Sequence, residues 1–168
     1  MKKIFLFDCD QTIWTSSNDN DYLGSVFSPL VLTSENSITR AVDGKVFSLK
    51  PQIRKFFGSI YTSGNIAGVI SDNRKDMVIN ALRLFGIYKF INPDAVNIKL
   101  WKGYCPKHKM VLEILRKPEF KSIPLSNTCW LDDKDYSEEA NSIGVSFVRI
   151  GDATLETPRD FLDWIGVK

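Results

Sequence analysis

Two aspartates stand one residue apart in the stretch FDCDQT, directly after an apolar run. Asp8 and Asp10 follow residues 4–7, which are all apolar and predict a buried strand. Two like charges this close repel each other, so they raise the free energy of the fold unless a cation, a shared proton or a reaction makes use of them. The spacing marks the end of this strand as a candidate site for chemistry.

Polar side chains also follow two later apolar stretches. The stretch ISDN places Ser71 and Asn73 behind one of them. The stretch WLDD places Asp132 and Asp133 behind the other, and Lys107 opens a predicted helix before it. The carboxyl ends of parallel strands share one sheet edge, where open α/β folds bind their ligands. These groups are therefore expected to converge with the first two aspartates.

Such a cluster suits the chemistry of phosphate esters. Several carboxylate oxygens make a hard, oxygen-rich pocket of the kind that Mg²⁺ prefers. A lysine and small hydroxyl donors suit the oxygens of a phosphate. One carboxylate can attack phosphorus, and a second, protonated one can give its proton to the leaving oxygen.

The same series resembles the four motifs of the haloacid dehalogenase superfamily of phosphohydrolases. DCDQT is similar to the first motif, DxDx(T/V), and WLDD to the acidic fourth. Ser71 stands for the second motif and Lys107 for the third, in the family's order over residues 8–133. The resemblance is closest to the small, minimally capped magnesium-dependent phosphatases, because of FDCDQTIW, the short insert before SLKP and the paired acids of LDD.

The resemblance implies a role for each aspartate. Asp8 would be the nucleophile, and Asp10 the general acid and later the base that activates water. Mg²⁺ would be held by Asp8, by Asp10 through its backbone carbonyl, and by Asp132. Asp133 would act as a further or water-mediated metal ligand, although Asp135 in the same stretch competes for a metal role.

The resemblance also implies ligands for the phosphoryl oxygens of the substrate. Ser71 and Lys107 would hold them, with Asn73 as a further candidate. Ser71 alternatively caps the following helix. Lys102 and Lys109 stand in the same stretch as Lys107, which is favoured because a proline precedes it at a predicted helix start.

The elements that must position these residues alternate between strand and helix. Apolar runs predict strands at 4–7, 66–70, 95–98, 129–131 and 145–150. Periodic stretches predict helices at 51–61, 74–85, 106–116 and 136–143, and a last one from 157 to about 165. The alternation predicts an α/β fold, a doubly wound parallel sheet with helices on both faces.

A short insert replaces the large cap of many relatives of this family. Residues 15–36 read mainly as loop with a candidate strand at 27–32, and 38–49 predict a hairpin around the two-residue turn Asp43-Gly44. Residues 1–168 are expected to form a single domain with an open site. Aromatic residues in or near the insert are equally consistent with packing and with substrate contact; they are Trp14, Tyr22, Phe27 and Phe47.

The composition of the chain limits the classes of binding partner that are expected. The chain has 168 residues, 43% hydrophobic and 25% charged, and a net charge of +2, which disfavours nucleic acid and gives no signal for membrane binding. The first apolar run is too short for a signal peptide, so a cytoplasmic protein is expected. The substrate is expected to be a phosphorylated small molecule or a phosphopeptide, and the sequence carries no signal for an oligomeric state.

Other phosphate chemistries fit less well. None of Cys9, Cys105 and Cys129 has an arginine six positions on, as C-x₅-R phosphatases require, and Cys9 is expected to pack in the core. The single histidine, His108, excludes a two-histidine mechanism and is expected on a helix surface. The alternative function is a non-hydrolytic phosphate-binding or phospho-accepting signalling domain on the same fold. Such receiver domains carry adjacent acids after their first strand and a lysine after their last strand, whereas here Asp10 stands two residues after Asp8 and Lys107 precedes the late acids.

Overall fold

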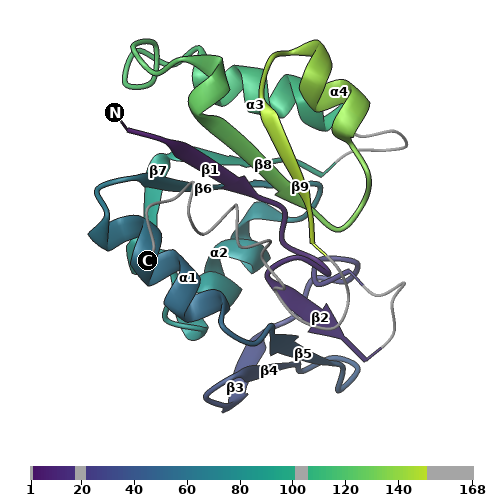
Figure 1. The fold of residues 1–168 in the computed structure, drawn as a ribbon. Helices are drawn as coiled ribbons and strands as arrows, with labels where there is room; N and C mark the ends of the chain where they lie inside the picture. The colour runs from purple at the N-terminus through teal and green to yellow at the C-terminus, as the bar shows by residue number, and fades with distance from the viewer. Residues whose placement is uncertain (1, 18–21, 101–105, 151–168) are drawn as a thin grey trace.

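A five-stranded parallel sheet forms the centre of the molecule (Figure 1). The computed structural model describes residues 2–17, 22–100 and 106–150. The strands run in the order β7-β6-β1-β8-β9, with every neighbouring pair parallel. Their bounds are β1 Ile4–Phe7, β6 Ile66–Ser71, β7 Ile91–Ile98, β8 Thr128–Asp132 and β9 Ser146–Arg149. This order, winding outward both ways from β1, confirms the predicted doubly wound sheet.

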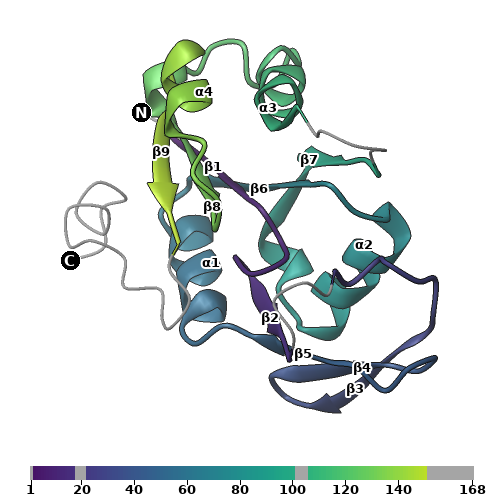
Figure 2. The ribbon, with the colours of Figure 1, turned by 90° about the vertical axis from the view of Figure 1, so that its right-hand side faces the viewer.

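Helices cover both faces of the sheet (Figures 1 and 2). Helices α1 and α2 pack on one face, and α3 and α4 on the other. Their bounds are α1 Ile53–Thr62, α2 Lys75–Leu84, α3 Lys107–Leu115 and α4 Ser137–Ser142. Two short 3₁₀ turns, η1 Tyr88–Phe90 and η2 Leu125–Asn127, precede β7 and β8. None of the helices in the described part of the chain is long and apolar enough to cross a membrane.

Strand β1 shows why its sequence is apolar throughout. Phe5 and Phe7 belong to the buried cluster under α1 and α2, whereas Ile4 and Leu6 belong to the cluster under α3 and α4. Successive side chains of a strand point to opposite faces, so a strand covered on both faces carries an uninterrupted apolar run. The strand is thereby fixed at the centre of the sheet, and the acids that follow it are fixed at its end.

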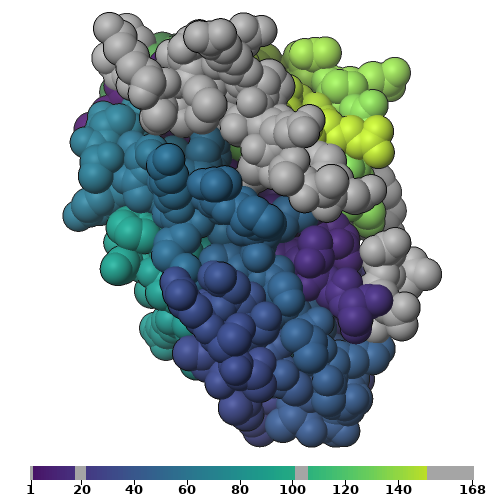
Figure 3. Space-filling model, turned by 60° about the horizontal axis from the view of Figure 1, so that its bottom comes forward, coloured from purple at the N-terminus to yellow at the C-terminus, as the bar shows by residue number. Residues whose placement is uncertain are grey.

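The insert forms a second, antiparallel sheet beyond the end of β1. Its strands lie in the order β2-β5-β4-β3. Their bounds are β2 Trp14–Ser16, β3 Leu30–Ser34, β4 Ser37–Arg40 and β5 Val46–Leu49. Figure 3 brings this end of the molecule forward and shows the insert as one continuous surface in purple and blue. Strand β2 lies in a stretch predicted as loop, and β3 begins and ends later than the predicted strand at 27–32.

The predicted two-residue turn in the insert is wrong. The pairing of β4 with β5 ends where the Arg40 amide donates to the Lys45 carbonyl (2.8 Å), and Gly44 N–H then closes the loop onto the Arg40 carbonyl (2.9 Å). Within this longer loop, Asp43 pairs with the Arg40 guanidinium (2.6 Å). Gly44 still has the positive φ, 69°, that favours glycine in such turns.

Strand β7 is the strand of the main sheet whose observed bounds differ most from the predicted ones. It starts at Ile91, four residues before the predicted start, and so includes Asn92, Pro93 and Asp94, which favour turns. An edge strand tolerates such residues, and β7 is an edge of the sheet with a shift in its pairing to β6. The other strands and helices of the main sheet lie within two residues of their predicted bounds. The helix predicted from 157 to about 165 falls outside the described residues.

The glycines of β6 and α1 allow a paired test of this packing. A Cβ on Gly68 would lie 2.3 Å from the Ala95 carbonyl oxygen and 2.7 Å from a Leu6 methyl, whereas a Cβ on Gly58 meets nothing within 4 Å. We expect Gly68→Ala to lower the free energy of unfolding by about 3 kcal/mol, because backbone blocks the new methyl. Gly58→Ala should raise it by about 0.5–1 kcal/mol through helix propensity. Urea unfolding followed by circular dichroism measures both, and equal effects would contradict the packing described.

Candidate active site

The ends of three neighbouring strands meet at one edge of the sheet. Asp8 follows β1 directly, and its N–H donates to the Leu131 carbonyl of β8 at 2.8 Å. Asp132 and Ser71 are the last residues of β8 and β6, the two strands that flank β1. Because the three strands are in parallel register, these side chains are brought together at the edge where the sequence predicted them.

Three carboxylates form one group, which we call the acid cluster. Asp8, Asp132 and Asp133 each offer a carboxylate oxygen, and these oxygens lie within 4.8 Å of one another. The Lys107 ammonium lies between two of them, with Nζ 2.9 Å from Asp8 Oδ1 and 2.7 Å from Asp132 Oδ2. Asp8 and Asp132 are buried and Asp133 is half-buried, and the openness of the site stays a prediction.

Burial of these carboxylates disfavours their charged forms. Burial raises the pKa of Asp8 to about 6, although the Lys107 ammonium counteracts it. Burial also raises the pKa values of Asp132 and Asp133 above their usual range. For Lys107, burial lowers the pKa, but the charges of Asp8 and Asp132 outweigh it and raise the pKa overall, so the lysine stays charged.

The acid cluster has the donor set of a hard divalent cation. One ammonium neutralises at most one of the three carboxylates, so negative charge remains. Carboxylate oxygens at this spacing are the ligands that Mg²⁺ takes. Among the described residues, only the Lys134 amide donates to Asp132 Oδ1, at 3.1 Å, which leaves a lone pair for a metal. The residues present therefore fit Mg²⁺.

Asp10 lies outside the acid cluster and has partners of its own. Its Oδ1 accepts from Trp14 Nε1 (2.9 Å) and from the Leu23 amide (3.1 Å), and its Oδ2 accepts from Asn73 Nδ2 (2.6 Å). Burial, followed by the charge of Asp8, raises the pKa of Asp10 to about 6 although these three donors oppose it. A carboxyl group with such a pKa can both give and take a proton near neutral pH.

The turn after β1 carries Asp10 to this position. The Cys9 carbonyl accepts from the amides of Thr12 (3.2 Å) and Ile13 (2.8 Å), and Gln11 has a positive φ of 60°. A side chain rarely adopts that backbone region, and such strain is common near functional sites. The turn reverses the chain within a few residues, so that Asp10 and Trp14 lie beside each other.

The predicted phosphate ligands reach the same edge. Ser71 is buried, and its hydroxyl hydrogen-bonds the Cys9 thiol. Asn73 is buried and is committed to Asp10 through Nδ2, while its Oδ1 accepts from the Arg74 amide at 2.7 Å. Lys107 is the first residue of α3 and contacts the acid cluster. Their roles toward a phosphate stay predictions.

The positions of the side chains distinguish between the alternative residues for the phosphate-binding lysine and for the last metal-binding acid. Lys109 is exposed, and Lys102 lies outside the described residues. Asp135 is exposed and accepts from the Ser137 amide at 3.0 Å, at the start of α4, and it is not part of the acid cluster. Among the described residues, Lys107 and Asp133 are the candidates that the fold places at the site.

Two tryptophans at the site were missed as hydrogen-bond donors. Trp130 Nε1 donates to Asp132 Oδ2 at 3.2 Å, and the indole of Trp14 donates to Asp10. The Trp130 ring stacks on Tyr136, 4.8 Å away, and the Lys107 ammonium lies 5.3 Å from the Tyr136 ring. The sequence could have indicated the Trp130 contact, because Trp130 and Asp132 are two residues apart on one strand and therefore point to the same face.

The structure separates the aromatic residues of the insert. Trp14 and Phe47 are fully buried in the core, so the substrate-contact interpretation is wrong for both. Tyr22 and Phe27 are exposed, at 46% and 65%, and stay candidates. Cys9 packs in the core, as predicted. His108 differs from the prediction, because it is half-buried in α3 rather than on the surface.

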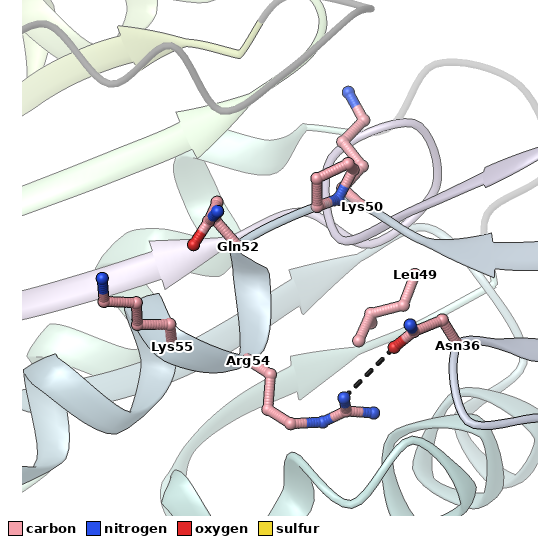
Figure 4. A pocket seen from close by; sticks show the side chains of 7 residues that line it. Asn36, Leu49, Lys50, Gln52, Arg54 and Lys55 are labelled. Atoms are coloured by element: carbon pink, nitrogen blue, oxygen red, sulfur yellow. Dashed lines mark hydrogen bonds between the residues drawn. The ribbon is translucent and has the colours of Figure 1, made fainter.

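A cavity of about 570 Å³ opens where β5 meets α1 (Figure 4). Arg54 Nη1 donates to Asn36 Oδ1 across it at 3.1 Å. Its lining contains none of the predicted catalytic, phosphate-binding or metal-binding residues. The lining residues are Asn36, Leu49, Lys50, Pro51, Gln52, Arg54 and Lys55.

Known structures share this arrangement of strands and helices. No family model and no curated protein sequence matches the chain. A haloacid dehalogenase superfamily hydrolase from Ehrlichia chaffeensis is 12% identical with a TM-score of 0.64, over 99% of this chain and 98% of that one. An uncharacterized protein from Listeria monocytogenes serotype 4b is 13% identical with a TM-score of 0.58, over 94% and 84%.

A third similar structure is larger. The fission yeast RNA polymerase II CTD phosphatase Fcp1, as its R271A variant bound to beryllium fluoride, is 14% identical with a TM-score of 0.50. The match covers 89% of this chain and only 41% of the yeast chain. At these identities the likeness concerns the fold. The chain thus has the fold of the haloacid dehalogenase superfamily hydrolases.

Proposed function

We propose that the protein is an Mg²⁺-dependent phosphomonoester hydrolase that works through a phosphorylated Asp8. The observation that carries this proposal is the separation of two kinds of carboxyl group at one sheet edge. Asp8 and Asp132 face a shared ammonium in the acid cluster. Asp10, two residues from Asp8, is held apart by three neutral donors. A nucleophile and an acid–base group need such different surroundings.

The first step transfers the phosphoryl group to the protein. A carboxylate oxygen of Asp8 attacks phosphorus, and the bond between phosphorus and the ester oxygen breaks. Asp10 gives its proton to that leaving oxygen. Lys107 and the Ser71 hydroxyl steady the phosphoryl oxygens, and Mg²⁺ at the acid cluster supplies positive charge that offsets the charge on them.

The second step frees the protein. Asp10, now ionised, takes a proton from water, whose oxygen attacks phosphorus as the bond to Asp8 breaks. Inorganic phosphate leaves, and Asp10 has regained its proton. The three donors around Asp10 hold its carboxylate in place in both protonation states, which allows one residue to serve as acid and then as base.

We propose a phosphorylated small molecule or a phosphopeptide as substrate. The yeast phosphatase of the same fold supports a phosphorylated substrate, and the net charge of +2 does not favour a polyanion. Tyr22 and Lys134 lie together beside the site, with the lysine Nζ 5.7 Å from the tyrosine ring, and both are exposed. They are placed to contact the part of a substrate that extends beyond the phosphate.

Replacing the nucleophile tests the first step. Asp8→Asn should lower kcat for p-nitrophenyl phosphate with Mg²⁺ by more than about 10³-fold, because an amide does not attack phosphorus. Asp94→Asn, which changes an exposed carboxylate on β7, should retain the wild-type rate. Equal rates for wild type and Asp8→Asn would contradict the assignment. A wild type that accumulates phosphorylated Asp8 without turnover would instead indicate a phospho-accepting signalling domain.

The pKa values of the two aspartates set the pH dependence. The rate rises as pH climbs through the pKa of Asp8, which must be ionised, and falls above the pKa of Asp10, which must keep its proton. Mg²⁺ beside Asp8 lowers the pKa of that carboxyl group, whereas the pKa of Asp10 is about 6. We therefore expect kcat/KM with Mg²⁺ to fall as pH rises above about 6, and the rising limb to lie at lower pH. Asp10→Asn should abolish the falling limb. A kcat/KM that stays flat between about pH 5 and pH 8 would contradict the acid role.

Metal binding can be measured without turnover. At ten times its Kd, Mg²⁺ should stabilise the protein by about 1.4 kcal/mol and raise Tm by about 3–6 °C. Asp133→Asn should reduce this shift, because it removes one carboxylate of the acid cluster. Asp135→Asn, two residues on, should leave the shift unchanged. Differential scanning calorimetry decides the matter, and a full shift in Asp133→Asn would exclude Asp133 as a ligand.

A further inference from the structure

A short loop of the insert reaches the candidate general acid. Residues 22–25 form a turn closed by a hydrogen bond from the Ser25 amide to the Tyr22 carbonyl (3.1 Å). We call this segment the acid-contact loop. Its Leu23 amide donates to Asp10 Oδ1, while the Leu23 side chain is fully buried in the core. The insert therefore supplies one of the three donors to Asp10 that come from the described residues.

Arg40 of β4 fixes the acid-contact loop from the other side. Its Nη1 is 2.9 Å from each of three oxygens of the loop, the carbonyls of Tyr22 and Leu23 and the hydroxyl of Ser25. Arg40 is only 1% exposed, and its contacts with two carbonyl groups and a hydroxyl restrict the position of the loop. Nη1 carries two N–H donors, so at least one of them is shared between two of these three acceptors, and the rigid plane of the guanidinium fixes their direction.

Arg40 is itself held firmly. Its Nε and Nη2 donate to the Asp43 carboxylate at 3.0 and 2.6 Å, and its Cζ lies 5.4 Å above the Phe47 ring. The paired carboxylate compensates the buried charge. The chain of contacts therefore runs from the insert sheet through Arg40 and the loop to Asp10.

Gly24 connects the same loop to the second donor of Asp10. A Cβ at Gly24 would lie 1.9 Å from Asn73 Oδ1 and 3.0 Å from the Arg74 amide. The loop therefore packs directly on the Asn73 amide group, whose Nδ2 donates to Asp10 Oδ2. Two of the three donors to Asp10 thus depend on where the acid-contact loop lies.

We propose that Arg40 is a positioning residue for catalysis, which holds the acid-contact loop so that Asp10 points at the leaving oxygen. The inference rests on the proposed function, in which Asp10 transfers its proton to that oxygen as the ester bond breaks. It assigns the insert a part in the chemistry. Without Arg40, the Leu23 amide and Asn73 lose their support, and Asp10 turns among orientations of which few allow proton transfer.

The test uses esters that need the acid to different degrees. The leaving oxygen of p-nitrophenyl phosphate is weakly basic and departs with little help, whereas that of phenyl phosphate is more basic and needs a proton. The parameter is kcat/KM, because it covers the steps up to departure of this oxygen and excludes hydrolysis of the phosphorylated protein. A merely structural loss lowers kcat/KM equally for both esters.

Arg40→Met should lower kcat/KM for phenyl phosphate at least about tenfold more than for p-nitrophenyl phosphate. Asp10→Asn sets the largest selective loss to expect. In the Asp10→Asn background, Arg40→Met should add no further selective loss, because it acts through Asp10. Arg40→Lys, which keeps the charge and loses the planar donors, should restore part of the selectivity.

Arg54→Met is the matched control. Arg54 also ties the insert to the main fold, through the Glu35 carboxylate (2.9 Å) and the Phe85 carbonyl (3.1 Å), and it makes no described bond to the acid-contact loop. It should lower kcat/KM for both esters to the same degree. Gly24→Ala displaces Asn73 without touching Arg40 and should reproduce the selective loss, so it carries the test if Arg40→Met does not fold.

The outcomes separate the two proposals. A wild type active on both esters, with Arg40→Met and Gly24→Ala reduced equally on each, would overturn the role of Arg40 and leave the proposed function standing. A wild type inactive on both esters with Mg²⁺ would overturn the proposed function and the role of Arg40 with it.

Discussion

The concentration of negative charge at one buried sheet edge is the constraint on which the rest of the structure depends. Parallel strands in register bring Asp8 and Asp132 together, and burial raises the pKa of each. Lys107 at the first turn of α3 compensates part of this charge. The Trp130 indole donates to the same Asp132 oxygen, Oδ2, and the Lys134 amide donates to the other, Oδ1. What these contacts leave uncompensated is what makes the site suited to a divalent cation.

The second feature of the site is that Asp10 has different hydrogen-bond partners from Asp8 and Asp132. It lies close enough to Asp8 for that charge to raise its pKa, yet its hydrogen bonds come from an indole, a backbone amide and a side-chain amide. These neutral donors orient the carboxyl group and favour its ionised form, but burial and the charge of Asp8 outweigh them and raise its pKa. One edge of the sheet therefore offers two kinds of carboxyl group: Asp8, paired with a lysine, and Asp10, held by neutral donors. The insert contacts Asp10 through the Leu23 amide, and Arg40 binds the loop that carries this amide.

Much of the fold and of the candidate site could be predicted from the sequence. The predictable parts are the elements with a periodic apolar pattern and the polar residues at strand ends. The apolar run before Asp8 and the acids after Trp130 mark the ends of two strands. Because the ends of parallel strands meet at one sheet edge, the sequence predicts that these acids lie together. The contacts around Asp10 could not be predicted. The Arg40 side chain sits in an alternating strand pattern, which says nothing about a loop seventeen residues earlier in the chain. The start of β7 was missed because local turn signals gave way to pairing at a sheet edge.

The most direct test of the account is the position of a bound divalent cation. Crystals soaked in Mn²⁺, which takes the same oxygen ligands as Mg²⁺ and scatters anomalously, would show it without any assumption about substrate. The account predicts an anomalous peak between the carboxylates of Asp8, Asp132 and Asp133, with Lys107 still beside Asp8. Fully ordered carboxylates with no peak among them, or a peak at another place on the surface, would contradict it.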